Sequence, residues 1–343
     1  MRTWQGYQKG VNLGGWFSQC EYSKERFDSF ITEADIARLA DWGLDHLRLP
    51  VDYNLVETED GEYKEEGFAY IKRAVDWCRK YGLNMILDLH KTAGYSFDPG
   101  ESQSGFFENE VYQERFYRLW EQFAARFAGY GDGIAFELLN EVVDETVCDA
   151  WNRISTECIK RIREIAPDTK ILLGGYWNNS VMAVKDLPMP YDENIVYNFH
   201  CYDPLIFTHQ GAYWVEGMPL DFRMGFDCTM QELKEQAAAN LPEYQANIIQ
   251  AARYEGKLDE NYFEDLFAEA IAVAEQRNVP LYCGEYGVID KASPEDTLAW
   301  YREIHTVFER HGIGRAAWSY KEMDFGLQDE HLECVLEQLT KLL

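Results

Sequence analysis

The sequence lacks the features typical of redox, zinc-binding and membrane proteins. Its eight cysteines form no C-x-x-C pair, so neither a zinc knuckle nor a redox dithiol is indicated. No run approaches 18 apolar residues, and the first six residues lack the apolar stretch of a signal peptide. As the chain stands we expect a soluble, cytoplasmic protein with reduced cysteines, although a secreted protein whose export signal had been removed would have the same sequence.

Positive charge is scarce. The chain has 32 Lys and Arg against 60 Asp and Glu, a formal net charge of -28. Such a surface repels nucleic acid and anionic membranes, so we expect neither as a partner. Glycines 10, 14 and 15 form no G-x-G-x-x-G motif leading into a helix, so a dinucleotide site is not indicated and we expect no cofactor and no metal. A neutral ligand is the simpler expectation, and the oligomeric state is left open.

The 343 residues are 46% hydrophobic and 15% aromatic, with 10 Trp and 22 Tyr. This is enough for a large core, and the surplus of aromatic rings suits the flat faces of sugars. Strand-like and helix-like segments alternate along the chain, which is typical of a parallel sheet covered by helices. Eight such units predict a single (β/α)8 TIM barrel over residues 1–343, with a doubly wound open sheet as the alternative.

The expected strands are residues 9–14, 44–49, 84–89, 134–141, 170–173, 195–199, 279–285 and 315–318. We expect Pro50 to stop the second strand. The expected helices are residues 32–42, 66–81, 111–127, 148–165, 261–277, 294–311 and a closing helix at 330–342. Between the sixth strand and the helix at 261 the alternation fails, and residues 203–259 are predicted to be a largely helical insertion near the active-site cleft, with a helix at 229–241.

The carboxyl ends of barrel strands open onto one face, so polar and aromatic residues at those ends are predicted to line one pocket. The residues at these positions are Asn12, Arg48, His90, Asn140, Glu141, Trp177, His200, Tyr202, Glu285 and Trp318.

Two of these residues, Glu141 and Glu285, suit glycoside hydrolysis, in which one carboxyl is protonated and the other ionised. We expect Arg48 and Tyr202 to lie beside Glu285 and stabilise its charge. Glu141 then acts as the acid, kept protonated partly by the negative charge of Glu285. Asn140 is expected to bind the sugar 2-OH and Trp318 to stack under the ring. Retention of configuration requires the two carboxyl groups to be about 5–5.5 Å apart.

The order of seven motifs resembles glycoside hydrolase family 5, of the barrel clan whose acid/base and nucleophile follow strands four and seven, and within it the clostridial single-domain endoglucanases. The motifs are G-V-N-L-G-G-W at 10–16, L-R-L-P at 47–50, L-D-L-H at 87–90, L-L-N-E at 138–141, Y-N-F-H-C-Y at 197–202, Y-C-G-E-Y-G at 282–287 and W-S-Y-K at 318–321. The resemblance implies a retaining enzyme on β-1,4 or mixed-linkage glucan, with Glu141 as acid/base and Glu285 as nucleophile. It implies a supporting shell of Arg48, His90, Asn140, His200, Tyr202 and Trp318, and a helical insertion after strand six.

Several alternatives stay open. Lys91 stands where such endoglucanases often have a second histidine, which leaves linkage and endo or exo action undecided; an exo-acting β-glucosidase or β-1,3-glucanase on short oligosaccharides is the nearest alternative. A metal-dependent barrel hydrolase using Asp88, His90 and His200, and a non-catalytic sugar-binding module, are more remote. Glu137 and Asp88 are interpreted as structural. The aromatic residues that serve either as packing or as sugar platforms are Trp16, Tyr95, Phe106, Trp177 and Trp214.

Overall fold

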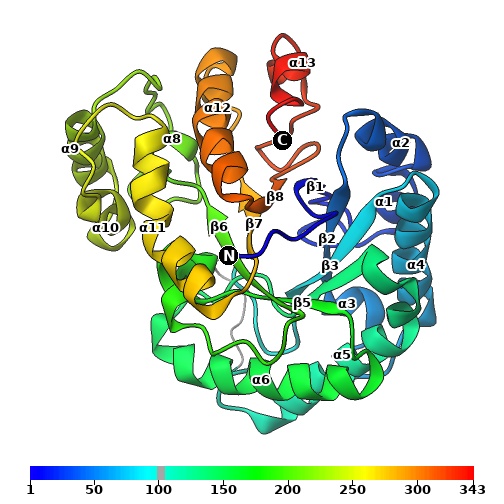
Figure 1. Ribbon diagram of the computed structural model, residues 1–343. Helices are drawn as coiled ribbons and strands as arrows, with labels where there is room; N and C mark the ends of the chain where they lie inside the picture. The colour runs from blue at the N-terminus through cyan, green and yellow to red at the C-terminus, as the bar shows by residue number, and fades with distance from the viewer. Residues whose placement is uncertain (99–104) are drawn as a thin grey trace.

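The computed structural model describes residues 1–98 and 105–343, in which eight parallel strands close into a barrel in sequence order (Figure 1). The strands are β1 (Lys9–Asn12), β2 (His46–Asp52), β3 (Asn84–Lys91), β4 (Ile134–Glu137), β5 (Lys170–Leu173), β6 (Ile195–Cys201), β7 (Leu281–Tyr286) and β8 (Gly314–Ala317). Pairing of Val11 with Ala317 joins the first strand to the last. The predicted fold class is therefore confirmed.

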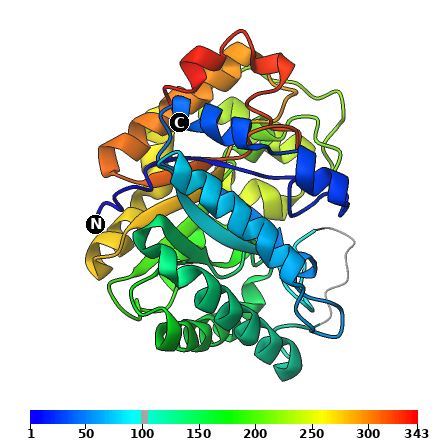
Figure 2. The same cartoon turned by 90° about the vertical axis from the view of Figure 1, so that its right-hand side faces the viewer.

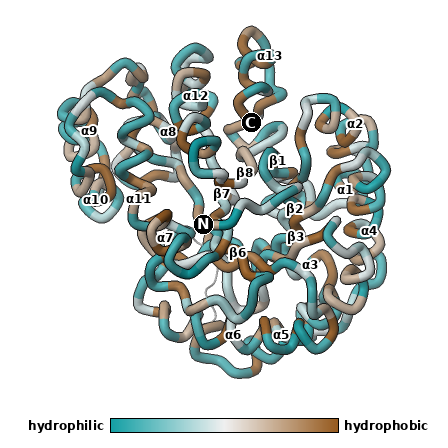
Figure 3. The backbone as a smooth tube through the Cα atoms, in the orientation of Figure 1, coloured by the Kyte–Doolittle hydropathy of each residue, from teal (hydrophilic) through white to brown (hydrophobic). Residues whose placement is uncertain are grey.

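The larger helices surround the strands as an outer ring (Figure 1). They are α2 (Glu33–Asp41), α4 (Glu65–Lys80), α5 (Glu110–Phe127), α6 (Cys148–Ile165), α11 (Glu260–Arg277) and α12 (Pro294–His311). Apolar and polar residues alternate along them (Figure 3), since each buries one stripe against the sheet. Within the described residues, no helix is both long and apolar enough to cross a membrane.

All strands carry their C-terminal ends to one side of the molecule. In Figure 2 the N-terminus lies at the left, whereas α1 (Lys24–Ser29), which follows β1, lies at the right. Because the strands are parallel, the loops that follow them gather on the same side as α1.

The barrel interior changes from apolar to polar along the strands. Near the N-terminal ends, a cluster that includes Trp4, Tyr7 and Ile86 fills the barrel. Two residues further along β3 comes Asp88, and two further His90, both fully or nearly fully buried. Alternate residues of a strand point to the same side, so this apolar base positions a polar layer directly beneath the open end.

Pro50 does not end the second strand, contrary to our expectation, because β2 continues to Asp52. The neighbouring strand β1 stops at Asn12, opposite Arg48. Because β1 has ended, none of its carbonyl groups needs an N–H from β2 beyond Arg48. Pro50, which has no N–H, therefore fits in β2, and the strand keeps its pairing with β3.

Two further boundaries were predicted wrongly. Strand β4 ends at Glu137, four residues before Glu141, although the N–H of Asn140 still donates to the Leu89 carbonyl at 3.2 Å. The closing helix expected at 330–342 is two short pieces, η4 (Glu330–Leu332) and α13 (Leu336–Leu339).

The segment 203–259 contains α8 (Leu205–Thr208), α9 (Met230–Asn240) and α10 (Glu243–Ala251). The pair α9 and α10 lies outside the helix ring, on the side of α8 and α11 (Figure 1). Thr229 begins α9 with a reciprocal capping box to Glu232, and this is the helix expected at 229–241. Backbone N–H groups of Arg253 and Tyr254 donate to Asp265 of α11 and fix the end of the segment.

Candidate active site

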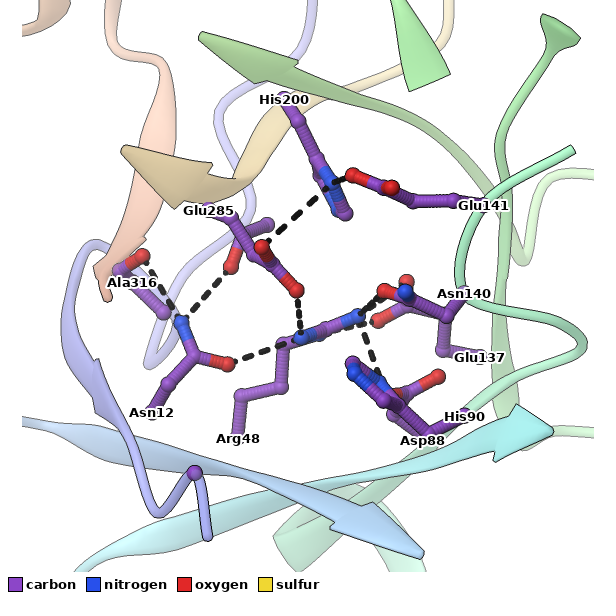
Figure 4. Close-up of polar contacts among 12 residues, drawn as sticks. Asn12, Arg48, Asp88, His90, Glu137, Asn140, Glu141, His200, Glu285 and Ala316 are labelled. Atoms are coloured by element: carbon purple, nitrogen blue, oxygen red, sulfur yellow. Dashed lines mark hydrogen bonds and ion pairs between the residues drawn. The ribbon is translucent and has the colours of Figure 1, made fainter. Parts of the chain in front are cut away.

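Arg48, fully buried on β2, is the centre of the polar layer (Figure 4). Its Nε and Nη2 donate to the two carboxylate oxygens of Glu137 at 2.6 and 2.8 Å, and its Nη2 lies 3.1 Å from Asp88. Asn198 also donates to Glu137, at 2.8 Å. Glu137 and Asp88 are thus held within the protein, consistent with the structural role predicted for them.

The same guanidinium orients two amides. Its Nη1 donates to Oδ1 of Asn12 at 2.8 Å, and its Nη2 donates to Oδ1 of Asn140 at 2.7 Å. The Nδ2 of Asn12 donates to the backbone carbonyls of Gly284 and Ala316. Both ends of this amide are therefore bound within the protein, and Asn12 supports the site without pointing into it. The Nδ2 of Asn140, in contrast, is buried without a hydrogen-bond partner among the described residues.

Glu285, near the end of β7, is 5% exposed and accepts hydrogen bonds on both oxygens. Arg48 Nη1 donates to Oε1 and the Tyr202 hydroxyl donates to Oε2, each at 2.8 Å. A cationic donor and a phenolic donor on one carboxylate suit its ionised form. Both partners were predicted from the sequence, and the structure places them as expected.

Glu141 lies in the loop after β4 and is 8% exposed. Its Oε1 is 2.7 Å from His200 Nδ1, and its Oε2 accepts a hydrogen bond from Asn178 at 2.7 Å. Burial raises the pKa of Glu141 to about 7, whereas the Asn178 bond and the charge of Arg48 act in the lowering direction. Burial is the main reason that the pKa of this carboxyl is raised, whereas we expected part of the effect to come from the charge of Glu285.

The carboxyl groups of Glu141 and Glu285 both lie close to His200. One oxygen of Glu141, one of Glu285 and a ring nitrogen of His200 all lie within 4.8 Å of one another. His200 Nδ1 is also 3.8 Å from Oε2 of Glu285. Burial lowers the pKa of His200 to about 4, so the imidazole between the acids is neutral. The distance of at most 4.8 Å between these oxygens of Glu141 and Glu285 is close to the roughly 5–5.5 Å between carboxyl groups that a double displacement needs.

His90, at the end of β3, is bound to Asp88 through Nδ1 at 2.5 Å. Burial lowers the pKa of His90 to about 4 and raises that of Asp88 to about 7. The imidazole lies parallel to the Trp318 ring, with centroids 5.7 Å apart and an angle of 1° between the planes. The structure therefore brings His90 and Trp318 together, as predicted.

The ligand set named for the remote alternative, a metal-dependent hydrolase, is not assembled. Asp88, His90 and His200 do not form a group of potential ligands in the described part of the chain, where Glu141, His200 and Glu285 make the one such group. Those three side chains are already linked by short contacts to one another, to Arg48 and to Tyr202.

A cavity of about 590 Å³ lies beside the loop that follows Glu141, and residues 143–147 of that loop line it. Tyr95, Phe107 and Val143 form part of its wall, together with two exposed aromatic side chains, Trp177 (43% exposed) and Tyr244 (63% exposed). Tyr244 belongs to α10, so the segment 203–259 reaches this cavity. Of the other possible sugar platforms, Trp16 is wholly buried against Phe17, whereas Phe106 adds to the cavity wall and Trp214 packs on His209.

Lys91, the departure from the resemblance, is buried at the end of β3. Its ammonium forms an ion pair with Asp98 and lies 5.9 Å from the centre of the Phe97 ring. The ion pair between Lys91 and Asp98 thus links the end of β3 to the loop that follows it.

Sequence reasoning missed Asn178 and Tyr244. Asn178 directly follows Trp177, which was recognised as a strand-end residue, but nothing in the sequence indicated that the chain would turn back toward Glu141. Tyr244 is one of 22 tyrosines, and its place in the cavity depends on how the segment 203–259 folds.

Comparisons with known proteins agree with this geometry. The model of the cellulase family (glycosyl hydrolase family 5) matches residues 5–324. The chain is 51% identical over 311 residues to Cellodextrinase A of Ruminococcus flavefaciens, covering 91% of this chain and 84% of that protein. It is 40% identical over 345 residues to Endoglucanase C of Acetivibrio thermocellus, covering 98% of each. The structure of endoglucanase Cel5A from Thermotoga maritima has the same fold, with a TM-score of 0.76 at 22% identity over 98% of this chain and 97% of that one.

Proposed function

Because the chain belongs to the cellulases of glycosyl hydrolase family 5, we propose that Glu285 is the nucleophile and Glu141 the acid/base with which it cleaves glucans. The chain is a glycoside hydrolase for β-linked glucans that acts with retention of configuration, and its substrate is an oligosaccharide or a polysaccharide. The residue roles and the finer choice of substrate are our proposal.

In the first step the Glu285 carboxylate forms a bond to the anomeric carbon while the bond from that carbon to the glycosidic oxygen breaks. Glu141 gives its proton to the departing oxygen. In the second step water attacks the same carbon and loses a proton to Glu141, and the bond to Glu285 breaks. The protein ends in its starting state, and two inversions amount to retention.

One observation carries this proposal: two carboxyl groups in different surroundings face the same small gap. Glu285 accepts from Arg48 and Tyr202, as a nucleophilic anion requires. Glu141 is buried with a pKa of about 7, as a proton donor near neutral pH requires. One oxygen of each lies within 4.8 Å of one oxygen of the other, close enough to serve one anomeric centre.

The surrounding groups fit a sugar ring in that gap. The Nδ2 of Asn140 has no hydrogen-bond partner among the described residues and is suited to donate to the sugar 2-OH. Trp318, parallel to His90 and 6% exposed, offers a flat surface for one sugar face.

For the finer specificity, we propose β-1,4-linked gluco-oligosaccharides, with the leaving part of the substrate in the cavity beside the loop that follows Glu141. The acid must lie on the leaving-group side, and this cavity of about 590 Å³ is lined by residues 143–147 of the loop that follows it. Trp177 and Tyr244 supply aromatic surface there. The names of the relatives, a cellodextrinase and an endoglucanase, support this substrate class.

Azide rescue of two alanine variants tests the two roles separately. With Glu285→Ala, azide occupies the place of the nucleophile and displaces an activated leaving group once, so an α-glycosyl azide is expected. With Glu141→Ala, azide attacks the glycosyl-enzyme from the opposite face, so a β-glycosyl azide is expected. Reversed products would exchange the two roles, and unchanged hydrolysis by either variant would reject that residue.

A further inference from the structure

The turn α7 (Tyr176–Asn179), which follows β5, has an unusual backbone. Trp177, Asn178 and Asn179 have φ values of +50°, +56° and +55°, so three consecutive non-glycine residues are left-handed. This conformation is strained for every residue with a side chain, and asparagine tolerates it best. A run of this kind persists only where the surrounding contacts hold it.

Those contacts come from the loop that carries Glu141. The N–H of Trp177 donates to the Val143 carbonyl at 3.2 Å, and that of Asn178 donates to the Val142 carbonyl at 3.0 Å. The Asn179 side chain donates to the Asn140 carbonyl at 2.5 Å. The turn is thus hydrogen-bonded to residues on both sides of Glu141.

The left-handed turn brings the Asn178 side chain into contact with Glu141. Its Nδ2 donates to Oε2 of Glu141 at 2.7 Å, and an amide N–H can only donate. Oε2 therefore accepts from Asn178, an arrangement that favours Oε1 as the oxygen that carries the proton of neutral Glu141. Oε1 is the oxygen 2.7 Å from His200 Nδ1, on the side that faces Glu285.

The other groups around Glu141 lie on three strands and in one loop. They are neutral His200 on β6, Glu285 on β7, Arg48 on β2, and Asp98 after β3, while the Tyr95 hydroxyl donates to the backbone carbonyl of Glu141. Of these, Arg48 favours the ionised carboxylate and Asp98 disfavours it, and burial disfavours it most. Asn178 is the residue whose donated hydrogen bond opposes that burial directly.

We propose that Asn178 is a positioning residue for the acid/base carboxyl: it keeps the transferable proton on Oε1 of Glu141 and stabilises the carboxylate left when that proton departs. The inference rests on the proposed role of Glu141. The proton moves from Oε1 to the glycosidic oxygen as the bond to the anomeric carbon breaks, and the negative charge that appears on Glu141 strengthens the bond from Asn178. The same bond then supports the carboxylate as the base of the second step.

Two substitutions separate the amide from the backbone conformation. Asn178→Gly accepts a φ of +56° without strain and removes the donor, whereas Asn178→Asp keeps the shape and places an acceptor against Oε2. The matched control is Asn278→Gly, because Asn278 is also left-handed, with a φ of +51°, but it is exposed at the end of α11. Asn278→Gly should leave activity unchanged.

The measurement is the pH profile of kcat/KM on two aryl β-cellobiosides that place no sugar on the leaving side. The phenyl compound needs its leaving oxygen protonated, whereas the 2,4-dinitrophenyl compound does not. For Asn178→Gly we expect kcat/KM on the phenyl substrate to fall about tenfold and the alkaline limb to move up by about one pH unit, since a bond to the ionised carboxylate is lost. The 2,4-dinitrophenyl substrate should change less than about twofold in this glycosylation step, and Asn178→Asp should move the limb further.

An equal fall on both substrates with an unmoved limb would overturn the proposal, because it would indicate structural damage alone. Wild-type behaviour of both variants would overturn it as well. If Asn178→Gly does not fold, the Asn178→Asp profile decides by the same criteria. These outcomes for the Asn178 variants do not test the role of Glu141. That role is tested separately by the azide products of Glu141→Ala.

Discussion

Arg48 Nη1 donates to Oε1 of Glu285 across 2.8 Å, in a place where the arginine is wholly buried. The same side chain neutralises Glu137 and Asp88. The nucleophile is therefore part of a buried charge network in which one cation serves three carboxylates, so folding stability and catalysis depend on the same contacts.

Replacing Arg48 by Met should lower the free energy of unfolding by about 3–5 kcal/mol, since buried carboxylates lose their partner, and should abolish turnover. Urea unfolding at pH 7 measures the first effect. A second substitution, Glu137→Gln, should restore part of the stability but no activity. Arg118→Met, at an exposed ion pair on α5, serves as the control and should change stability by less than about 0.5 kcal/mol. An Arg48→Met variant as stable as the wild type would contradict the network.

The pKa of about 7 at Glu141 predicts the alkaline limb of the pH profile. Below that pH the carboxyl is protonated and able to donate. Above it the proton is lost, and kcat/KM on a substrate with a poor leaving group should fall about tenfold per pH unit. Initial rates on phenyl β-cellobioside from pH 4 to 9 give the profile. The 2,4-dinitrophenyl compound needs no protonation of its leaving oxygen, so its kcat/KM should lack this limb in the wild type. A limb of equal size on both substrates would assign the titration to another group.

The fold could be predicted from the sequence because each unit carries its own pattern. The helix expected from residue 32 is α2, and Thr32 and Asp35 form a capping box at its start. Pro50 misled us because its tolerance depends on where a different strand, β1, ends. The closing helix was predicted too long, and the chain there forms only η4 and α13.

Glu141, Glu285, Arg48 and Tyr202 could be found in the sequence because a closed barrel converts strand-end positions into neighbours. Asn178 could not be found in this way. Its contact with Glu141 needs three left-handed residues, which no local pattern of side chains required. The reason for the raised pKa of Glu141 was also missed, because burial depends on the packing of the loops and not on the two acids alone.

Tyr244, on α10, predicts how chain length affects turnover. Tyr244→Ala should lower kcat/KM about threefold to tenfold for cello-oligosaccharides that extend into the cavity beside the loop that follows Glu141, a loss in line with one aromatic contact. Aryl cellobiosides, which place no sugar there, should be unaffected. Tyr191→Ala removes another exposed tyrosine, outside that cavity, and serves as the control. A uniform loss on both kinds of substrate would show that Tyr244 does not contact the leaving chain.

Removal of divalent metals should leave activity unchanged. Asp88 and His90 are bound to each other, and Glu141, His200 and Glu285 have the contacts that an acid and a nucleophile require. Dialysis against a chelator followed by rate measurements with and without added Zn²⁺, Mg²⁺ or Ca²⁺ checks this. Loss of activity that a metal restores would favour a metal-dependent hydrolase instead.

The most direct test of the central claim is to trap the covalent intermediate. A 2-deoxy-2-fluoro-β-cellobioside with an activated leaving group slows both steps but allows the first to proceed, so the labelled enzyme accumulates. Digestion and mass spectrometry of the peptides should then place one sugar on Glu285, with Glu141 unlabelled. A sugar on any other residue, or turnover by Glu285→Gln at the wild-type rate, would contradict the account.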